Sequence, residues 1–295
     1  MRVLVTGANG MLGTDLCEML EAAGHEVVRT DVAAHNGDRE YKWESLDITD
    51  THQVARCLLN HQPNCVIHAA AYTDVDGCER NPDLAFRVNG LGTWNIASVC
   101  GAHHITLIYI STDFVFDGSK GEPYTEFDPS NSLNHYGASK LAGEQYVRQL
   151  CRQHFVARTA WLFGIHGPSF PSKMLELAKT RTDLSVVVDQ VGCPTYTRDL
   201  VHALLELLPS QLYGTYHITN AGACSWYEFA KTTLELAGVN ITVHPMPADK
   251  WPSPTKRPHY SVLRNYAFEL QGRKLLRPWK DAVVEYLGRR ANSSA

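Results

Sequence analysis

Short apolar runs rich in β-branched residues alternate with longer segments whose apolar positions recur at helical spacing through about the first half of the chain. Helices are predicted over Met11–Ala23, from Thr51, from the Asn81-Pro82 cap to about Cys100, and from Tyr136 to about Gln153. The apolar runs predict strands at Val3–Thr6, His25–Thr30, Cys65–Ala70, Ile105–Ile110 and Phe155–Ala160. Nearly all-apolar strands are typical of a parallel sheet with helices on both faces. The pattern predicts an α/β fold, a doubly wound parallel-sheet Rossmann domain.

The alternation is less regular after Trp161. Helices near 172–180, 198–208 and 225–237 and strands at Leu184–Val188 and Thr215–Thr219 are predicted there. The five prolines between Pro245 and Pro258 predict a long loop, and the small polar tail Ala291–Ala295 is expected to fray. We therefore predict a Rossmann domain over 1–160, to which about 189–222 returns. A smaller C-terminal α/β substrate domain would comprise about 161–188 and 223–295.

Charge and hydropathy exclude several classes of protein. Lysine and arginine number 27 against 31 acidic residues, a formal net charge of −4, which disfavours non-specific binding to nucleic acid or to an anionic membrane. No apolar run is long enough to span a membrane, and the N-terminal apolar run is too short for a secretory signal. A cytoplasmic protein with neither a nucleic-acid nor a membrane partner is expected.

The cysteines and histidines do not indicate a metal centre. No two of the eight cysteines are separated by two residues, so the usual zinc and redox-pair spacings are absent. In a chain of this length without a signal peptide, reduced thiols are expected. The fourteen histidines include no HExxH pattern, and we expect no protein-bound metal.

A glycine-rich segment follows the first predicted strand and opens the first predicted helix. It reads Gly7-Ala8-Asn9-Gly10-Met11-Leu12-Gly13, a GxxGxxG spacing rather than the commoner GxGxxG. Glycines let the backbone approach a pyrophosphate, and the helix N-terminus supplies oriented N–H groups. A tight turn that only packs the helix on the strand is the alternative. The strand–turn–helix context near the chain start favours a dinucleotide site.

Two groups of acidic residues follow at positions that suit the adenosine half of a dinucleotide. Asp31 ends the second predicted strand, 18 residues beyond Gly13, close to the offset at which an acid meets the ribose hydroxyls. In Asp47-Ile48-Thr49-Asp50, a carboxylate could lie beside the adenine amino group or could cap the helix from Thr51. The sequence leaves these two readings of the second group open.

Tyr136 and Lys140 are four residues apart near the start of a predicted helix, so their side chains share one face. A nearby ammonium stabilises a phenolate and lowers the pKa of the phenol, which suits a proton donor. Tyrosine and lysine at this spacing usually only decorate a helix surface. Ser111-Thr112-Asp113 follows a predicted strand, at the carboxyl edge where such sheets hold their ligands.

These residues resemble the extended short-chain dehydrogenase/reductase family, and within it the dTDP-sugar reductases. The resemblance runs from Met1 to about residue 287. Its motifs are VTGANGMLG at 5–13, HAAAYTDVDGCE at 68–79, VNGLGTWNIA at 88–97, YISTDFVFDG at 109–118, YGASKLAGE at 136–144, RTAWLFG at 158–164, DQVGCPTYTRDL at 189–200 and RPHYSVL at 257–263. The segments STDFVFDG and AAAYTDVD differ from those of sugar-nucleotide epimerases and dehydratases.

The resemblance implies NADH or NADPH as cofactor and a dTDP-sugar as substrate, with hydride transfer to the C4 keto group of dTDP-4-dehydro-L-rhamnose. It implies three catalytic residues: Tyr136 as proton donor, Lys140, and Thr112 on the reacting oxygen. Cofactor contacts are implied for the same Tyr136 and Lys140 and for Gly7, Asn9, Gly10, Met11, Leu12, Gly13, Asp31, Asp47, Ile48, Ala69, Ala70, Ala71, Tyr72, Asn89 and Ser111. Substrate contacts are implied for Thr73, Val75, Thr112, Asp113, Trp161 and Arg257.

Arg257 also has support from the local charge pattern. The segment from Lys250 to Arg264 carries four basic residues and no acidic one in an acidic chain. A guanidinium suits a sugar diphosphate, whereas a solvated basic loop is the alternative. Trp161 could equally be a core aromatic residue at a strand end.

A carboxylate at Asp31 would repel a 2′-phosphate, so NADH is the expected preference. Arg29 and Arg39 could reduce that repulsion, although Arg29 belongs to the predicted strand. Other readings stay open: a reductase of another nucleotide 4-keto-6-deoxyhexose, or a non-catalytic subunit resembling the β-subunit of methionine adenosyltransferase.

The resemblance also bears on assembly and on one helix start. Some members of the family form a magnesium-linked dimer from acidic residues, but Arg198 stands at one such position, and we do not expect that mode here. A monomer or homodimer is expected. Ser169 stands where many relatives carry an asparagine, which leaves the contacts near Lys173 open.

Overall fold

The structure, a computed structural model, describes residues 1–32 and 43–293. Its centre is a seven-stranded sheet in which every neighbouring pair is parallel, in the order β11-β6-β5-β4-β1-β2-β3. The strands are β1 (Arg2–Thr6), β2 (Glu26–Asp31), β3 (Trp43–Ser45), β4 (Cys65–His68), β5 (Thr106–Thr112), β6 (His154–Thr159) and β11 (Gly214–His217). Strand order reverses between β1 and β4, and ligands bind at the carboxyl ends of strands at such a point.

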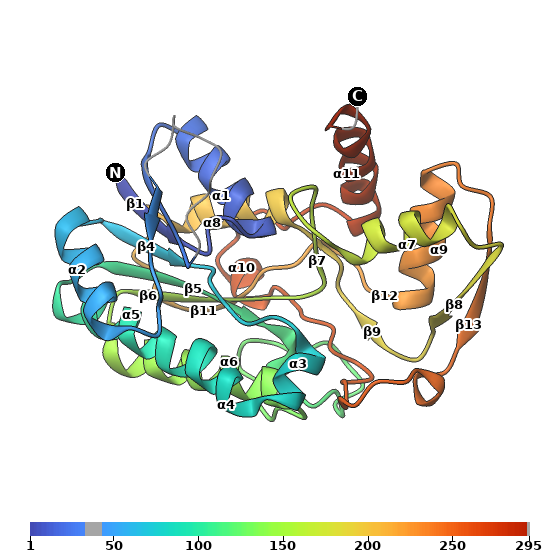
Figure 1. The fold of residues 1–295 in the computed structure, drawn as a ribbon, viewed down its shortest axis with the longest axis horizontal. Coiled ribbons are helices and arrows are strands. Elements are labelled where there is room, and N and C mark those ends of the chain that lie inside the picture. Colours follow the sequence, from blue (N-terminus) through green and yellow to red (C-terminus); the bar gives the residue numbers. More distant parts are fainter. Residues whose placement is uncertain (33–42, 294–295) are drawn as a thin grey trace.

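Helices cover both faces of this sheet, as the apolar strands predicted (Figure 1). One face packs against α1 (Met11–Ala22) and α8 (Thr197–Leu207), the other against α2 (Thr51–His61), α5 (Thr93–Ala102) and α6 (His135–Leu150). Successive residues of β1 point to opposite cores: Val3 and Val5 join the first, Leu4 the second. The α/β doubly wound prediction is confirmed.

A smaller group of elements lies beside the sheet, at the right of Figure 1. It contains α7 (Phe170–Ala178), α9 (Trp226–Leu236), α11 (Trp279–Ser293) and the parallel pair β8 (Asp183–Val187) and β13 (Thr242–Met246). Two further two-stranded ribbons are β7 (Leu162–Phe163) with β10 (Thr195–Tyr196), and β9 (Val191–Gly192) with β12 (Cys224–Ser225). The remaining short elements are α3 (Val75–Arg80), α4 (Pro82–Ala85), η1 (Phe86–Gly92), η2 (Asp113–Val115), η3 (Ala248–Lys250) and α10 (Tyr266–Leu270).

The helix predicted from Asn81 to Cys100 is helical throughout, but its middle is not an α-helix. The segment Phe86–Gly92 is a π-helix between α4 and α5. The Thr93 hydroxyl donates to the Asn89 carbonyl at 2.7 Å, and a Cβ at Gly92 would lie 2.7 Å from Ile48. The π segment therefore packs tightly against Ile48, and such segments are frequent at functional sites.

Two sequence predictions are wrong in the second half. The loop expected over Pro245–Pro258 begins with a strand, since Pro245 and Met246 pair with β8 in β13. Proline is tolerated in an edge strand because its missing N–H can face away from the partner. Of the tail Ala291–Ala295 that was expected to fray, the part as far as Ser293 is helical in α11, and residues 294–295 lie outside the described residues. Buried Trp279, Val283 and Tyr286 anchor this helix.

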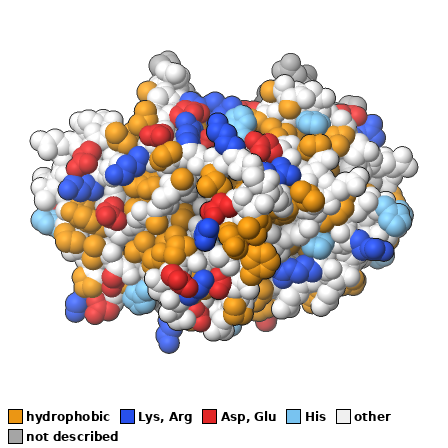
Figure 2. All heavy atoms as spheres, turned by 180° about the vertical axis from the view of Figure 1, so that it is seen from behind, with side chains coloured by type: hydrophobic (Ala, Val, Ile, Leu, Met, Phe, Trp, Pro, Cys, Tyr) orange, Lys and Arg blue, Asp and Glu red, His pale blue; other side chains and the backbone are white. Residues whose placement is uncertain are grey.

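The rear face, shown in Figure 2, has acidic and basic side chains interspersed among apolar patches. No helix among residues 1–32 and 43–293 is long and apolar enough to cross a membrane.

Candidate active site

A cavity of about 740 Å³ opens along the carboxyl ends of β1, β4, β5 and β6. Its wall runs from the glycine-rich turn after β1 to Trp226 and Arg257 in the smaller part of the chain. Twenty residues singled out from the sequence line it: Gly7, Gly10, Met11, Leu12, Gly13, Asp31, Asp47, Ile48, Ala69, Ala70, Ala71, Thr73, Val75, Ser111, Thr112, Asp113, Tyr136, Lys140, Trp161 and Arg257. Asn9, Tyr72 and Asn89 do not line it.

The glycine-rich turn is built for close backbone approach. Gly7 has φ +69°, and a Cβ there would lie 2.7 Å from the Ala70 nitrogen. A Cβ at Gly13 would lie 2.0 Å from the Gly7 carbonyl oxygen. Gly10 is the N-cap of α1 and offers no side-chain cap, so the N–H groups of the first helical turn face the cavity without a competing acceptor from that residue. This geometry fits a pyrophosphate.

Asp31 lies at the end of β2 and lines the cavity. Its carboxylate accepts hydrogen bonds from the backbone N–H of Asn9 at 3.0 Å and of Val32 at 2.8 Å. Arg29 is buried and forms a two-bond pair with Glu21, which commits its guanidinium to α1 rather than to the cavity. Arg39 lies outside the described residues.

The open choice in the second acidic group has a structural answer. Asp50 caps α2, accepting from the N–H groups of His52 and Gln53. Asp47 binds the Thr49 N–H and hydroxyl, and together with Ile48 it lines the cavity. The cap and the cavity-lining carboxylate are therefore different residues.

Asn89 lies behind the cavity wall. Its side-chain carbonyl accepts from the Tyr72 N–H at 2.8 Å, and its amide donates to the Tyr72 carbonyl and to the Ser139 hydroxyl. Asn89 is 1% exposed. It ties the segment after β4 to η1 and α6, which holds Ala69–Ala71 at the cavity.

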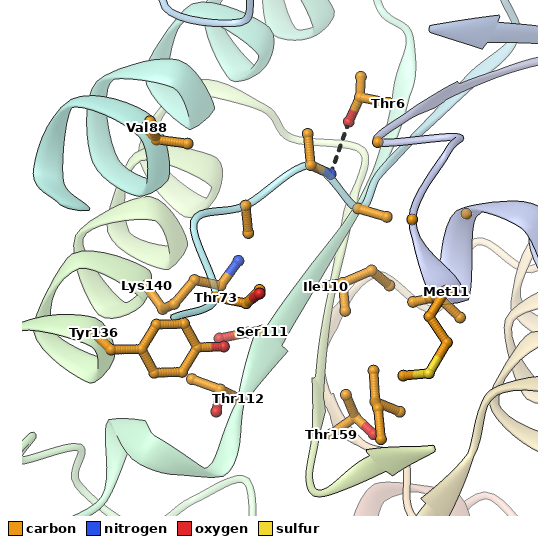
Figure 3. Close-up of a pocket in the computed structure, with 18 of the residues that line it drawn as sticks. Thr6, Met11, Thr73, Val88, Ile110, Ser111, Thr112, Tyr136, Lys140 and Thr159 are labelled. Carbon is orange, nitrogen blue, oxygen red and sulfur yellow. Dashed lines mark hydrogen bonds between the residues drawn. The ribbon is translucent and has the colours of Figure 1, made fainter. Parts of the chain in front are cut away.

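The candidate catalytic side chains converge from two elements. Tyr136 and Lys140 project from α6 toward Thr73, Ser111 and Thr112, while Met11, Ile110 and Thr159 lie across the cavity (Figure 3). Asn134 caps α6 by accepting from the Gly137 N–H at 2.9 Å, which fixes where the helix begins. Tyr136 follows in the first turn and Lys140 one turn later.

The Tyr136 phenol is held in its protonated form. Burial raises its pKa well above its usual value, and the Thr112 hydroxyl opposes that rise only in part. The sequence predicted instead that Lys140 would lower this pKa, and that expectation is not met in this structure because burial dominates. A phenol that stays protonated is nevertheless the form that donates a proton to a developing alkoxide.

Burial has the opposite effect on Lys140. It lowers the pKa of the ammonium to about 7, and the charge of Glu144 opposes that effect. The ammonium lies over the ring of Tyr109, and the neighbouring His68 is neutral because burial lowers its pKa to about 3. Lys140 therefore titrates near neutral pH.

Glu144 organises the buried layer beneath the site. It accepts from the Ser111 hydroxyl at 2.6 Å and from the guanidinium groups of Arg158 and Arg148. Burial alone would raise the pKa of Glu144, but the charges and hydrogen bonds of the two arginines and Ser111 lower it below its usual value. The Ser111 hydroxyl is thus fixed by α6 at the strand end.

The remaining polar groups of the cavity come from both parts of the chain. Asp113 is buried, its carboxylate accepts from the hydroxyls of Thr112 and Ser261, and burial raises its pKa to about 6. The Arg257 guanidinium pairs with Asp76 at 3.0 Å, and its Nε is a buried donor with no hydrogen-bond partner among the described residues.

The basic segment predicted around Arg257 is partly neutralised by partners that the sequence alone could not reveal. Arg257 meets Asp76, and Arg264 meets Glu269. Asp76 also accepts from the Ser253 hydroxyl.

Several cavity-lining residues were not anticipated: Thr6, Val32, Leu46, Thr49, Val88, Ile110, Phe114, Thr159, Ala160, Leu162, Pro168 and Trp226. Thr159 and Ala160 could have been found, since they end a predicted strand at the same carboxyl edge as Thr112. Pro168 and Trp226 carried no local signal, because only the packing of the smaller part of the chain brings them to the cavity.

Outside the cavity, two groups of side chains bring metal-ligating atoms together within the described residues: Glu44, Cys57 and His61, and Asp15, Glu18 and His166. Arg198 lies 3.4 Å from Asp15 and 3.6 Å from Glu18, so a guanidinium already meets the second group. All eight cysteines are free and buried. Ser169 caps α7 with Ser172 in a reciprocal capping box.

The chain resembles known proteins over nearly its whole length. The model of the RmlD substrate binding domain matches residues 1–292. The solved dTDP-4-dehydrorhamnose reductase of Clostridium acetobutylicum is 42% identical, with a TM-score of 0.91 over 98% of this chain and 99% of that one. The Bacillus anthracis dTDP-4-dehydrorhamnose reductase, solved in complex with NADP, is 38% identical, with a TM-score of 0.92 over 98% and 99%. The dTDP-4-keto-6-deoxy-D-glucose reductase of Streptomyces niveus is 37% identical over 96% of each chain.

Proposed function

Because this chain belongs to the RmlD substrate binding domain family, we propose that it is an NAD(P)H-dependent oxidoreductase that reduces dTDP-4-dehydro-L-rhamnose to dTDP-L-rhamnose. The observation that carries the proposal is the convergence of Tyr136, Lys140 and Thr112 on one cavity that also reaches the glycine-rich turn. A proton donor and a dinucleotide-binding turn in the same cavity are what carbonyl reduction requires.

The residues present fit a nicotinamide dinucleotide. Gly7 and Gly13 leave no room for a Cβ, and the first turn of α1 faces the cavity with its N–H groups. Asp31 supplies a carboxylate where the adenosine ribose would lie, which favours NADH over NADPH. When bound, the reduced cofactor supplies the hydride that the sugar C4 accepts.

The chain's own residues would orient the carbonyl oxygen of the sugar and protonate it. The Thr112 hydroxyl lies beside the Tyr136 phenol and would orient the sugar O4 toward it. As C4 gains a hydride, the C=O π electrons move onto O4, and the Tyr136 hydroxyl gives its proton to that oxygen. The charged Lys140 stabilises the phenolate that remains. Ser111, held by Glu144, borders the same spot.

Arg257 supports a diphosphate substrate. Its Nε is buried and unpartnered among the described residues, while its terminal nitrogen holds Asp76. A buried donor left without a partner costs free energy until a ligand satisfies it. An anionic phosphate oxygen at the cavity mouth would do so.

A second candidate substrate has its own support. A relative 37% identical over 96% of this chain is a dTDP-4-keto-6-deoxy-D-glucose reductase. The proton donor would contact the keto group and the glycine-rich turn would contact the dinucleotide. Neither of them distinguishes the configuration of the sugar. A reductase of that isomer would use the same Tyr136, Lys140 and Thr112.

The test is direct. Purified protein is incubated with each dTDP-4-keto-6-deoxyhexose and with NADH or NADPH, and the loss of nicotinamide absorbance is followed. Oxidation of the cofactor with dTDP-4-dehydro-L-rhamnose, and identification of dTDP-L-rhamnose by NMR, supports the proposal. Turnover with the D-gluco isomer alone selects the second candidate, and no turnover with either sugar rejects both.

A further inference from the structure

Trp161 has an unusual backbone at the edge of the cavity. Its φ is +46°, a left-handed conformation that a bulky L-residue rarely adopts. Such strain persists only where the surroundings fix it, and it gathers at ligand sites. Trp161 lines the same cavity as Tyr136 and Thr112. Two restraints hold this residue in place.

One restraint is a stacked indole. The rings of Trp161 and Trp226 lie 3.5 Å apart between centroids and only 8° from parallel. Aromatic pairs prefer offset or edge-to-face arrangements with centroids about 4.5–7 Å apart. The close, nearly parallel stack is therefore imposed by neighbouring packing. Phe170 supplies part of it, with its ring 4.6 Å from that of Trp226.

The other restraint is a glycine. A Cβ at Gly192 would lie 2.5 Å from Cε2 of Trp161 and 2.7 Å from its Nε1. The indole therefore occupies the volume that any side chain at Gly192 would need.

A short ribbon links the two restraints. Gly192 pairs with Cys224 in the antiparallel ribbon of β9 and β12. Trp226 follows directly, as the first residue of α9, and Ser225 caps that helix through a reciprocal bond with Glu228. The ribbon therefore positions the glycine and the second indole together. On the opposite side, the Trp161 carbonyl accepts from the Thr195 N–H at 3.2 Å.

We propose that Gly192 and Trp226 are positioning residues that preset the Trp161 indole for the apolar face of a 6-deoxyhexose. A 4-keto-6-deoxyhexose presents C–H bonds and a C6 methyl group. An indole face packs better against this methyl group than against the hydroxymethyl group of an ordinary hexose. A side chain fixed before binding loses no rotamer freedom when the sugar arrives. The identity of the sugar rests on the proposed function. The arrangement of Trp161, Trp226 and Gly192, which we call the indole clamp, does not depend on it.

The clamp has a spectroscopic signature in the free protein. Two indoles stacked this closely couple excitonically and give a paired band in far-ultraviolet circular dichroism. Trp226→Phe and Trp161→Phe should each abolish that couplet while the rest of the spectrum stays folded. Gly192→Ala should weaken it, because the new methyl group displaces the indole. Gly288→Ala is the matched control, since a Cβ there meets nothing within 4 Å.

The functional test separates the sugar from the nucleotide. Calorimetry measures the affinities of dTDP and of dTDP-L-rhamnose, and their ratio isolates the contribution of the sugar. Trp226→Leu and Gly192→Ala should reduce the extra affinity that dTDP-L-rhamnose has over dTDP. They should also lower kcat/KM for the keto sugar by about tenfold or more, because a small misplacement of a substrate-positioning side chain slows the reaction strongly. Affinity for dTDP and for NADH should stay within about twofold. Trp226→Phe, which keeps an aromatic partner, should restore most of the ratio.

Three results would overturn the proposal: no couplet in the wild-type protein, an unchanged sugar contribution in Gly192→Ala, or equal losses for dTDP and dTDP-L-rhamnose. If Trp226→Leu does not fold, Gly192→Ala and Trp226→Phe still decide it. Failure of the proposed function would look different, since the wild-type protein would keep its couplet but would not turn over the keto sugar.

Discussion

The Lys140 ammonium lies 4.2 Å from the centroid of the Tyr109 ring, and both side chains are buried. A cation over an aromatic face is attracted to it, more strongly where water is excluded. The Tyr109 hydroxyl donates to the Lys140 backbone carbonyl at 3.2 Å, which ties the ring to α6. The Tyr109 ring therefore favours the charged form of Lys140, whereas burial of the ammonium disfavours it.

The activity of the protein should depend on pH through the charge of Lys140. Burial lowers the pKa of Lys140 to about 7. In the proposed function, the charged form of Lys140 stabilises the phenolate that Tyr136 becomes after it gives up its proton. A lysine is protonated below its pKa, so kcat/KM for the keto sugar should be full on the acid side and decline as pH rises through about 7. Other groups around the ammonium are Tyr136 and Glu144 on α6, Tyr109 on β5 and neutral His68 on β4.

The control for this pH profile is a pair of substitutions. Tyr109→Phe keeps the aromatic face and should leave the alkaline decline where it is. Tyr109→Leu removes that face and should move the decline to lower pH. If the decline is absent from the wild type, or if it does not move in Tyr109→Leu, the buried position of Lys140 against the Tyr109 ring does not control its charge.

Glu144→Gln should cost more stability than an ordinary surface change. It removes the negative partner of buried Arg158 and leaves a guanidinium uncompensated, and breaking a buried pair costs about 3–5 kcal/mol. Glu176→Gln, at an exposed acid paired with Lys179 and Arg290, should cost far less, because exposed ion pairs contribute little to stability. Urea unfolding monitored by circular dichroism gives both values, and equal losses would remove the special role of Glu144.

Arg257→Ala should weaken binding of the dTDP-sugar but not of NADH. Hydrogen bonds to charged groups contribute about 1.5–3 kcal/mol, so the affinity for dTDP-L-rhamnose should fall tenfold or more. Arg273→Ala, whose guanidinium bonds the distant Glu206 carbonyl, serves as the control. If calorimetry finds the affinity for dTDP-L-rhamnose unchanged, Arg257 does not contact the substrate and serves only in its ion pair with Asp76.

Asp31→Ala should narrow or reverse the preference for NADH. The wild-type carboxylate would repel a 2′-phosphate, and the Arg29 guanidinium already pairs with Glu21. The measurement is kcat/KM with NADH and with NADPH in both proteins. Glu26→Ala, an exposed acid at the start of the same strand, should leave the ratio unchanged. A wild-type preference for NADPH would contradict the assignment.

The parts of the site that are local in sequence could be predicted from it. The glycine-rich turn follows one strand directly and Thr112 ends another, so periodicity places both at one sheet edge. Periodicity also puts Tyr136 and Lys140 on one helix face, but only the family resemblance implied that this face meets the same cavity. The strands of the main sheet were predicted for the same reason, apart from the short edge strand Trp43–Ser45.

The parts that depend on distant contacts could not be predicted. Trp226 reaches the cavity only because β9 and β12 pair, and Arg257 meets an acid 181 residues away. The upward shift of the Tyr136 pKa could not be predicted either, because it follows from burial and not from the spacing to Lys140. The terminal helix around Trp279 was missed because its buried residues face a core built by other segments.

The most direct test of the account is the fate of the hydride and of the proton donor. With [4,4-²H₂]NADH and dTDP-4-dehydro-L-rhamnose, the wild-type protein should form dTDP-L-rhamnose carrying deuterium at C4, detected by NMR. Tyr136→Phe should bind both ligands but form this product about 10²–10⁴-fold more slowly, because a general acid is lost. Product without deuterium at C4, or a Tyr136→Phe rate within about threefold of wild type, would contradict the account.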